Sequence, residues 1–427
     1  MCYAASAFWE ALGIGPRLRE KMPQDGGEAP HAMALLAMTA NRLARPASKL
    51  ACDEHGLADA VYGPEAKALA LAHRDRALDF LRRHSEARAQ ELCCRTADLC
   101  NAAVDLICWD TTPLDAEIAA EDAAGEGWED QESPARRTRG PHQAGRDGNP
   151  QVGVGLARTR DGWPVRSWVW PGHPAAVTTI THLQDDLRGW RLNRGVCVGE
   201  SGRCSETTRQ RLSRALGRSM LAVPMRQVTA GPRNVLTRAG RDRDVAHHLR
   251  VKEVYGGAGE RRRRSLVCHH PAEAARAHAP RARLLARVRA ELAARDTRRA
   301  DPPQQACELL AARRFGRSRR MEAQGRLRLE AAQVAAEATD AGKCVVTTTA
   351  DTLAAADVAL GYTSMTLSDG CCRQMQTTGL QTRPLDQWRP RRSSAHVQLW
   401  VLALLRQRAA EIRGQQTWRT IRHPLDQ

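Results

Sequence analysis

The chain has 427 residues, of which 42% are hydrophobic and only 4% aromatic, and it carries a formal net charge of +17 at pH 7. This length suffices for two or three domains with mainly aliphatic cores. The chain has no run of 18 apolar residues and no signal-peptide pattern at its N-terminus. We therefore expect no membrane span and a cytoplasmic protein. Arginine carries most of the charge, and its forked guanidinium favours a polyanionic partner such as DNA.

The 13 cysteines include no CxxC pair. Cys93-Cys94 and Cys371-Cys372 are adjacent pairs, which are too close for tetrahedral zinc spacing. Cys268-His269-His270 resembles a set of metal ligands but has no partner cluster, so we interpret it as incidental. We expect reduced thiols with no special chemistry.

Residues 1–98 are expected to be helical, because apolar residues recur every three or four positions in 31–43 and 66–81. This segment is either a purely structural helical bundle or a domain that recognises DNA ends. The next signal is an apolar run, 104–109, closed by Asp110 and two threonines. It predicts a buried strand that delivers Asp110 to the end of a sheet, although Asp110 can also cap an ordinary turn.

Residues 119–148 are rich in Gly, Pro and Asp and predict a loop. Two strands, 151–160 and 163–170, should form a hairpin through Asp161-Gly162, followed by a helix over 177–187. Trp168 and Trp170 would share one face of the second strand. We favour packing over base stacking for these two rings.

A second short strand, 195–199, delivers Glu200 and repeats the pattern of strand, acid and small residues seen at Asp110. A helix should follow over 205–216. Residues 218–264 form the densest basic stretch, which favours phosphate contact over a solvated loop; it ends in Arg261, Arg262, Arg263 and Arg264. Beyond it we expect one long helix with Leu284, Leu285, Val288 and Leu292 on one face, strands over 325–329 and 343–349, and a mainly helical end with a buried helix over 397–405.

Asp110, Glu200 and a third acid on a C-terminal helix would satisfy a two-metal site. Mg²⁺ prefers carboxylate oxygens, and two such ions about 4 Å apart support phosphodiester cleavage and transfer. The residue pattern alone does not select the third acid.

The chain resembles DDE transposases of bacterial insertion sequences, in the IS-four-like group with a ribonuclease H-like catalytic core. The resemblance runs over nearly the whole chain. The segments that carry it are 40–43 with Pro46 and 48–50, 76–81, 104–112, 150–172, 185–187, 199–206 and 357–362.

The resemblance places Asp110 on the family's first catalytic Asp and Glu200 where the family has its second Asp. The family's third acid is a Glu in the pattern Tyr-x2-Arg-x3-Glu-x6-Lys. Tyr362 matches the Tyr, and Asp369 stands in place of the Glu. Met365 and Gln376 replace the Arg and Lys, whereas Arg373 fits an arginine common after the acid.

The resemblance implies an α/β fold, a ribonuclease H-like mixed sheet flanked by helices. The implied domains are an N-terminal helical DNA-end-binding domain (1–98), the first part of the core (99–217), a basic, partly helical insertion (218–344) and the C-terminal part of the core (345–427). The implied activity is metal-dependent cleavage and strand transfer of element ends. Asp110, Glu200 and Asp369 would hold two Mg²⁺ or Mn²⁺ ions, while Tyr362, Arg373 and Arg261 to Arg264 would bind DNA.

The implied partners are the element's terminal repeats and target DNA, bound by a homodimer close to the bacterial nucleoid. Because the catalytic pattern departs from the family, a catalytically inactive DNA-binding relic is the main alternative. Another ribonuclease H-like nuclease, such as a resolvase, is a third possibility, but the long insertion and the position of Tyr362 disfavour it.

Overall fold

The structure is a computed structural model of the whole chain. The residues that it describes are 2–21, 30–44, 46, 69–84, 106–116, 120–122, 137–139, 149–172, 176–189, 196–200, 218–223, 230–246, 248–256, 263–296, 319–321, 327–364 and 390–422.

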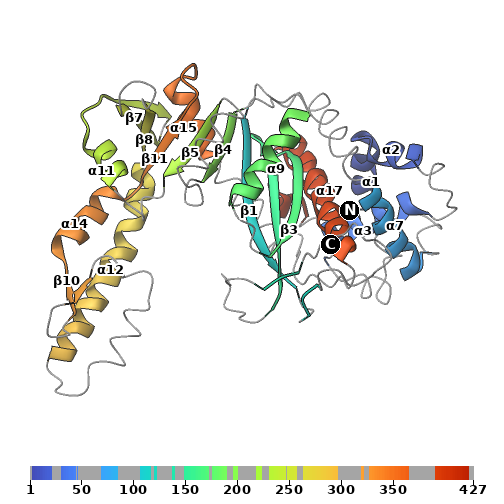
Figure 1. The fold of residues 1–427 in the computed structure, drawn as a ribbon, viewed down its shortest axis with the longest axis horizontal. Coiled ribbons are helices and arrows are strands. Elements are labelled where there is room, and N and C mark those ends of the chain that lie inside the picture. The colour runs from blue at the N-terminus through green and yellow to red at the C-terminus, as the bar shows by residue number, and fades with distance from the viewer. Residues whose placement is uncertain are drawn as a thin grey trace. The chain divides into compact units, whose positions relative to one another are not determined.

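The protein is a mixed α/β protein, as predicted. Its described strands form a nine-stranded mixed sheet in the order β3-β2-β1-β4-β5-β11-β8-β7-β6, with flanking helices and a helical N-terminal part (Figure 1). The chain divides into two compact units, one made of Met1–Met220 with Leu360–Gln427 and the other of Leu221–Ala359. The second unit is therefore inserted into the first along the chain.

The first unit contains most of the helices and the first strands. Its elements are α1 (Cys2–Ala11), α2 (Ile14–Lys21), α3 (His31–Ala44), α7 (Leu71–Arg83), β1 (Leu106–Asp115), β2 (Gln151–Thr159), β3 (Pro164–Pro171), α9 (Ala176–Gly189), β4 (Val196–Glu200), α17 (Pro390–Gly414) and α18 (Trp418–Arg422). Two elements cross the limits between the units, β5 (Ser219–Val223) and α15 (Ala355–Thr363).

The second unit carries its own part of the sheet and one long helix, α12. Its elements are α11 (Ala230–Thr237), β6 (Asp242–Ala246), β7 (Leu249–Gly256), β8 (Arg263–His269), α12 (Pro271–Asp296), β9 (Arg319–Met321), β10 (Leu327–Leu329), α14 (Ala331–Asp340) and β11 (Lys343–Thr348). The basic stretch 218–264 thus contains four strands that the charge pattern did not predict. The helix predicted over 205–216 lies outside the described residues.

The β2–β3 hairpin confirms the prediction from Asp161-Gly162. Gly162 has a φ of +85°, which is the left-handed conformation that this turn requires. The prediction that β1 ends at Asp110 is wrong, because the strand continues to Asp115. Thr111 and Thr112 pair with Gly155 and Val154 in the antiparallel ladder, so the backbone stays extended beyond the carboxylate.

One face of β2 is aliphatic and packs on α17. Val152, Val154 and Leu156 alternate along β2 and form one core. The residues that complete this core are Leu43, Leu114, Val397, Trp400, Ala403 and Leu404. Because Trp400 and Val397 belong to α17, the predicted buried helix over 397–405 is confirmed as part of a longer one.

The other face of β2 carries small residues under two tryptophans. Gly155 pairs with Trp168, and a Cβ atom at Gly155 would lie 2.4 Å from the ring of Trp170. The two indole rings stack 6.0 Å apart, and their N–H groups donate to Asp186 and His182 of α9, each at 2.7 Å. The predicted packing role of these tryptophans is confirmed, and α9 covers this face (Figure 1).

The N-terminal helices pack against a second side of α17. Trp9, Leu35 and Phe80 come from α1, α3 and α7, and they share a buried cluster with Leu399 and Leu405 of α17. Across the unit, Arg392 of α17 bridges Asp75 and Asp79 of α7 at 2.9 and 2.8 Å. This helical region therefore belongs to the same compact unit as β1 to β4.

Candidate functional site

Asp110 stands in the middle of β1 on the sheet face that α17 covers. It pairs with Leu156 of β2, and directly paired residues share a face of the sheet. The carboxylate is half-buried, and its Oδ1 accepts a hydrogen bond of 2.7 Å from the backbone N–H of Thr111. A carboxylate fixed by its own backbone in a partly exposed position is suited to bind a cation or a polar ligand.

Glu200 is the last residue of β4, which runs parallel to β1. The register pairs Leu106 with Val196 and Cys108 with Val198. Two residues farther along each strand are Asp110 and Glu200, so the two predicted acids occupy matching positions on neighbouring parallel strands. Neighbouring strands lie only about 4.8 Å apart.

Trp109 explains the glycine that precedes Glu200. A Cβ atom at Gly199 would lie 2.7 Å from Nε1 of Trp109, so the indole ring rests against the backbone of β4. A larger residue at this position would push the end of β4 away from β1.

The end of α15 lies on the same face of β1 as Asp110. Cys108 is two residues before Asp110 and therefore shares its face, and its Sγ lies 3.3 Å from Oγ of Ser364. Ser364 directly follows α15, and Tyr362 occupies that helix as a half-buried residue. The structure therefore brings Asp110, Glu200 and the α15 end into one unit.

Arg158 is a residue of this region that the sequence interpretation missed. It lies opposite Cys108 on β2, is 1% exposed, and donates from Nη2 to the carbonyl of Ser364 and from Nη1 to that of Thr159 at 3.0 Å. A cation that donates to the last carbonyls of a helix satisfies acceptors that have no partner within the helix. The available signal was an arginine inside an otherwise apolar strand.

Within the predicted cluster Arg261 to Arg264, the structure describes the side chain of Arg264. Arg264 is 5% exposed, and its Nε pairs with Oε1 of Glu253 at 2.7 Å. Its Nη1 donates to the carbonyls of Ala350 and Leu353 at 3.0 and 2.7 Å. A hydrogen bond from Tyr255 to Glu253, aided by Arg264, lowers the pKa of that carboxyl group. Arg264 thus binds protein acceptors here, and DNA contact by this cluster stays a prediction.

The structure describes some of the other predicted residues. Arg263 is the first residue of β8, whereas Arg261 and Arg262 lie outside the described residues. Asp369 and Arg373 also lie outside them. His396 is 3% exposed in α17, and its Nε2 lies 3.1 Å from Nη2 of Arg42.

The carboxylates present suit Mg²⁺ or Mn²⁺ by their chemistry, because both ions prefer hard oxygen ligands. Asp110 supplies such oxygens, and Glu200 follows at the matching position. Within the residues that the structure describes, no group of three or more His, Cys, Asp and Glu side chains is arranged to hold a metal. A metal site here stays a prediction, which rests on two strand positions and on Asp369 as the third acid.

Two of the described thiols face each other in the second unit. Cys268 of β8 pairs directly with Cys344 of β11, and both are free, as is Cys108. The Cys268 thiol donates to the Cys344 sulfur, which lowers the pKa of Cys344 and raises that of Cys268.

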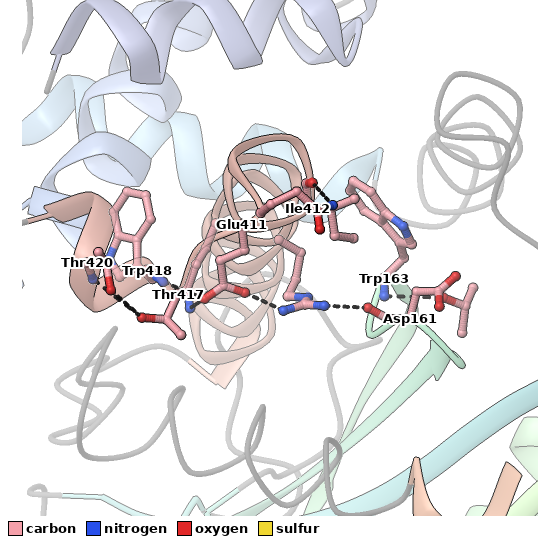
Figure 2. A network of polar contacts seen from close by, with 11 residues as sticks. Asp161, Trp163, Glu411, Ile412, Thr417, Trp418 and Thr420 are labelled. Atoms are coloured by element: carbon pink, nitrogen blue, oxygen red, sulfur yellow. Dashed lines mark hydrogen bonds and ion pairs between the residues drawn. The ribbon is translucent and has the colours of Figure 1, made fainter. Parts of the chain in front are cut away.

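A second polar cluster joins α17 to its neighbours (Figure 2). Arg408 donates to the carbonyl of Asp161 at 2.6 Å and pairs with Glu411, which is 8% exposed. Glu411 also accepts from Nε2 of Gln407 at 3.1 Å and from the backbone N–H of Trp418 at 3.0 Å. The carboxylate is surrounded by donors from its own unit, so this cluster is a structural joint between α17, α18 and the β2–β3 turn.

None of the helices built from described residues is both long and apolar enough to cross a membrane. Comparisons with protein-family models and with curated proteins give no match for this chain.

Proposed function

We propose that this protein is a DDE-type DNA transposase with a ribonuclease H-like core, in the IS-four-like group that its sequence resembles. The observation that carries the proposal is the matching position of Asp110 and Glu200 on the parallel strands β1 and β4. Acids at equivalent positions of adjacent strands are what a site for two divalent cations needs.

The order of the strands supports the same proposal. β3, β2 and β1 are antiparallel neighbours, β4 joins β1 in parallel, and β5 follows β4. This order of the first five strands supports the proposed ribonuclease H-like core. The unit Leu221–Ala359 lies between Glu200 and Asp369 in the chain, where the family has its insertion.

In this mechanism Asp110, Glu200 and Asp369 would hold two Mg²⁺ or Mn²⁺ ions. When bound, such ions activate the attacking oxygen and stabilise the leaving oxygen of a phosphodiester. The Thr111 N–H fixes the orientation of the Asp110 carboxylate before any ligand arrives. Tyr362, Arg373 and Arg261 to Arg263 would position the DNA backbone, whereas Arg264 is bonded to protein acceptors.

The proposed reaction has two steps. Hydrolysis at the element's end frees a 3′-hydroxyl group, and this group then displaces a phosphodiester of the target DNA in line. The partners are double-stranded terminal repeats and target DNA, and two copies of the chain act on two ends near the nucleoid.

A catalytically inactive relic that still binds DNA is the second candidate. It is favoured by Met365 and Gln376, which remove two cationic groups from the family pattern, and by the exchanged acids at positions 200 and 369. One methylene of reach is about 1.3 Å, and a misplacement of about 1 Å can cost about a hundredfold in rate.

The deciding experiment is Mg²⁺- or Mn²⁺-dependent nicking of a labelled DNA fragment that carries the flanking repeats. We expect Asp110→Asn and Glu200→Gln each to lower the rate by about a hundredfold or more, since each removes a metal ligand. Asp161→Asn is the matched control, because this exposed acid lies at the hairpin turn.

Cleavage that persists in Asp110→Asn would refute the proposed site. DNA binding without cleavage by the natural chain would establish the relic, and absence of binding would refute both candidates.

A further inference from the structure

A stripe of three exposed arginines runs along one side of α12 in the second unit. Arg276, Arg283 and Arg287 are all exposed. Spacings of seven and four residues place them on one face of a helix with 3.6 residues per turn. The stripe rises about 16 Å along the helix axis, from 1.5 Å per residue.

The opposite side of α12 packs on its own unit. Val288 is buried, Leu284 and Leu285 are half-buried, and Nη1 of Arg281 donates to the carbonyl of Glu337 in α14 at 3.1 Å. These contacts hold one side of α12 against its own unit, and the arginine stripe lies on another side of this helix, which contains Pro280.

The residues on one flank of the stripe are small. Ala279, Ala286 and Ala290 flank the arginines, and all three are exposed. Alanine side chains end at Cβ, so the guanidinium groups stand above their surroundings and a broad ligand can approach them. Glu273 lies beside the stripe and pairs with Arg276 at 2.7 Å, while 58% of its side chain stays exposed.

We propose that the stripe of Arg276, Arg283 and Arg287 on α12 binds the phosphate backbone of double-stranded DNA. This inference rests on the proposed function, because it takes DNA as the ligand, and it adds a binding surface apart from the acids of β1 and β4. Duplex DNA carries one negative charge per about 1.7 Å of axis, so a 16 Å stripe passes several phosphates. Contacts to phosphate carry no sequence information, so the surface binds any duplex.

The test is the salt dependence of binding between the full chain and a labelled duplex of unrelated sequence. The variant Arg276→Gln, Arg283→Gln, Arg287→Gln keeps good helix formers at exposed positions. The slope of log affinity against log salt is negative, and each lost phosphate contact reduces its magnitude by about 0.9. We therefore expect the magnitude of the slope to fall by about 2 to 3. Replacing the same three arginines by lysine should keep the slope.

The matched control removes three charges elsewhere, by Arg413→Gln, Arg419→Gln and Arg422→Gln near the end of the first unit. An equal loss of slope in this control would overturn the α12 surface, because it would show a general charge effect. An unchanged slope in the α12 variant would also overturn it.

The Asp110→Asn variant separates this inference from the proposed chemistry, since it should bind DNA with the natural slope. If the natural chain binds no DNA, both the proposed function and the α12 surface fail. If it binds and only the α12 variant loses slope, the surface is established whether or not cleavage occurs.

Discussion

The two faces of the β1–β2–β3 sheet are built in opposite ways. On the α9 face, Gly155 and its small neighbours on β2 leave room for the stacked rings of Trp168 and Trp170, whose N–H groups both bind α9. On the α17 face, aliphatic side chains fill the core, and the polar groups Asp110 and Arg158 interrupt it.

This difference indicates which face of the sheet can carry a functional group. On the α9 face the N–H groups of Trp168 and Trp170 donate to α9. The α17 face keeps a half-buried carboxylate between an aliphatic core and the end of α15. A rigid apolar support beneath a partly exposed acid favours precise positioning of that acid.

Trp400→Ala should cause the largest loss, because Trp400 fills the aliphatic core of the α17 face and is 0% exposed. Its ring also packs edge-on against His396 at 4.4 Å and lies under Arg42 at 5.8 Å. We expect the free energy of unfolding to fall by about 4 kcal/mol. Urea denaturation measures this, and a loss below about 1 kcal/mol would mean that α17 is loosely packed.

Gly155→Val tests the opposite face. The new side chain would overlap the Trp170 ring, whose Cζ3 lies 2.4 Å from the position of a Cβ atom. We expect the free energy of unfolding to fall by about 3 kcal/mol, because the stacked rings must move. Near-ultraviolet circular dichroism should change with it, and an unchanged spectrum at full stability would contradict the described stack.

Local sequence patterns predicted the elements that short-range interactions determine. The β2–β3 hairpin followed from Asp161-Gly162, and β4 and β11 followed from short apolar runs between turn residues. In contrast, β7 was missed because Arg250 and Lys252 interrupt the apolar residues that its burial pattern follows. Alternation in a charged strand is hard to separate from a solvated loop.

Long-range contacts account for what the sequence could not predict about the site. Asp110 and Glu200 were predicted as acids at strand ends, yet their matching positions depend on the register of a parallel pair. Arg158 meets Ser364, which is 206 residues farther along the chain. No periodic pattern in the sequence predicts such a contact, because it forms only when the end of α15 packs against β1.

Arg406→Met tests a third surface, which is the side of α17 that faces the N-terminal helices. Arg406 is 1% exposed, and its three guanidinium nitrogens have no hydrogen-bond partner among the described residues. It lies 5.5 Å from the Trp9 ring, and burial lowers its pKa to about 9. Replacing a buried, uncompensated charge by an apolar side chain should raise the free energy of unfolding by about 2 kcal/mol at pH 7.

The gain from Arg406→Met should shrink as the pH rises above about 9. The folded natural chain then loses the Arg406 proton while the unfolded chain keeps it, so the natural protein gains stability with pH. Urea titrations of both proteins at pH 7 and at about pH 10 measure the difference. A variant that is less stable at pH 7 would mean that the guanidinium has a compensating partner.

Trp168→Phe should have the smallest effect and separates polar from apolar contributions on the α9 face. Phenylalanine keeps most of the ring but loses the N–H that donates to Oδ2 of Asp186, which also accepts from Nε of Arg166 at 2.9 Å. Because Arg166 still balances the carboxylate, the cost should be about 1.5 kcal/mol, near the lower end for a hydrogen bond to a charged group. A double-mutant cycle with Asp186→Asn should give a coupling of about 1 kcal/mol, whereas additive losses would mean that the indole contributes through packing alone. In that case the α9 face would be held by ring contacts, as the α17 face is held by its aliphatic core, and the contrast between them would lie only in the placement of Asp110.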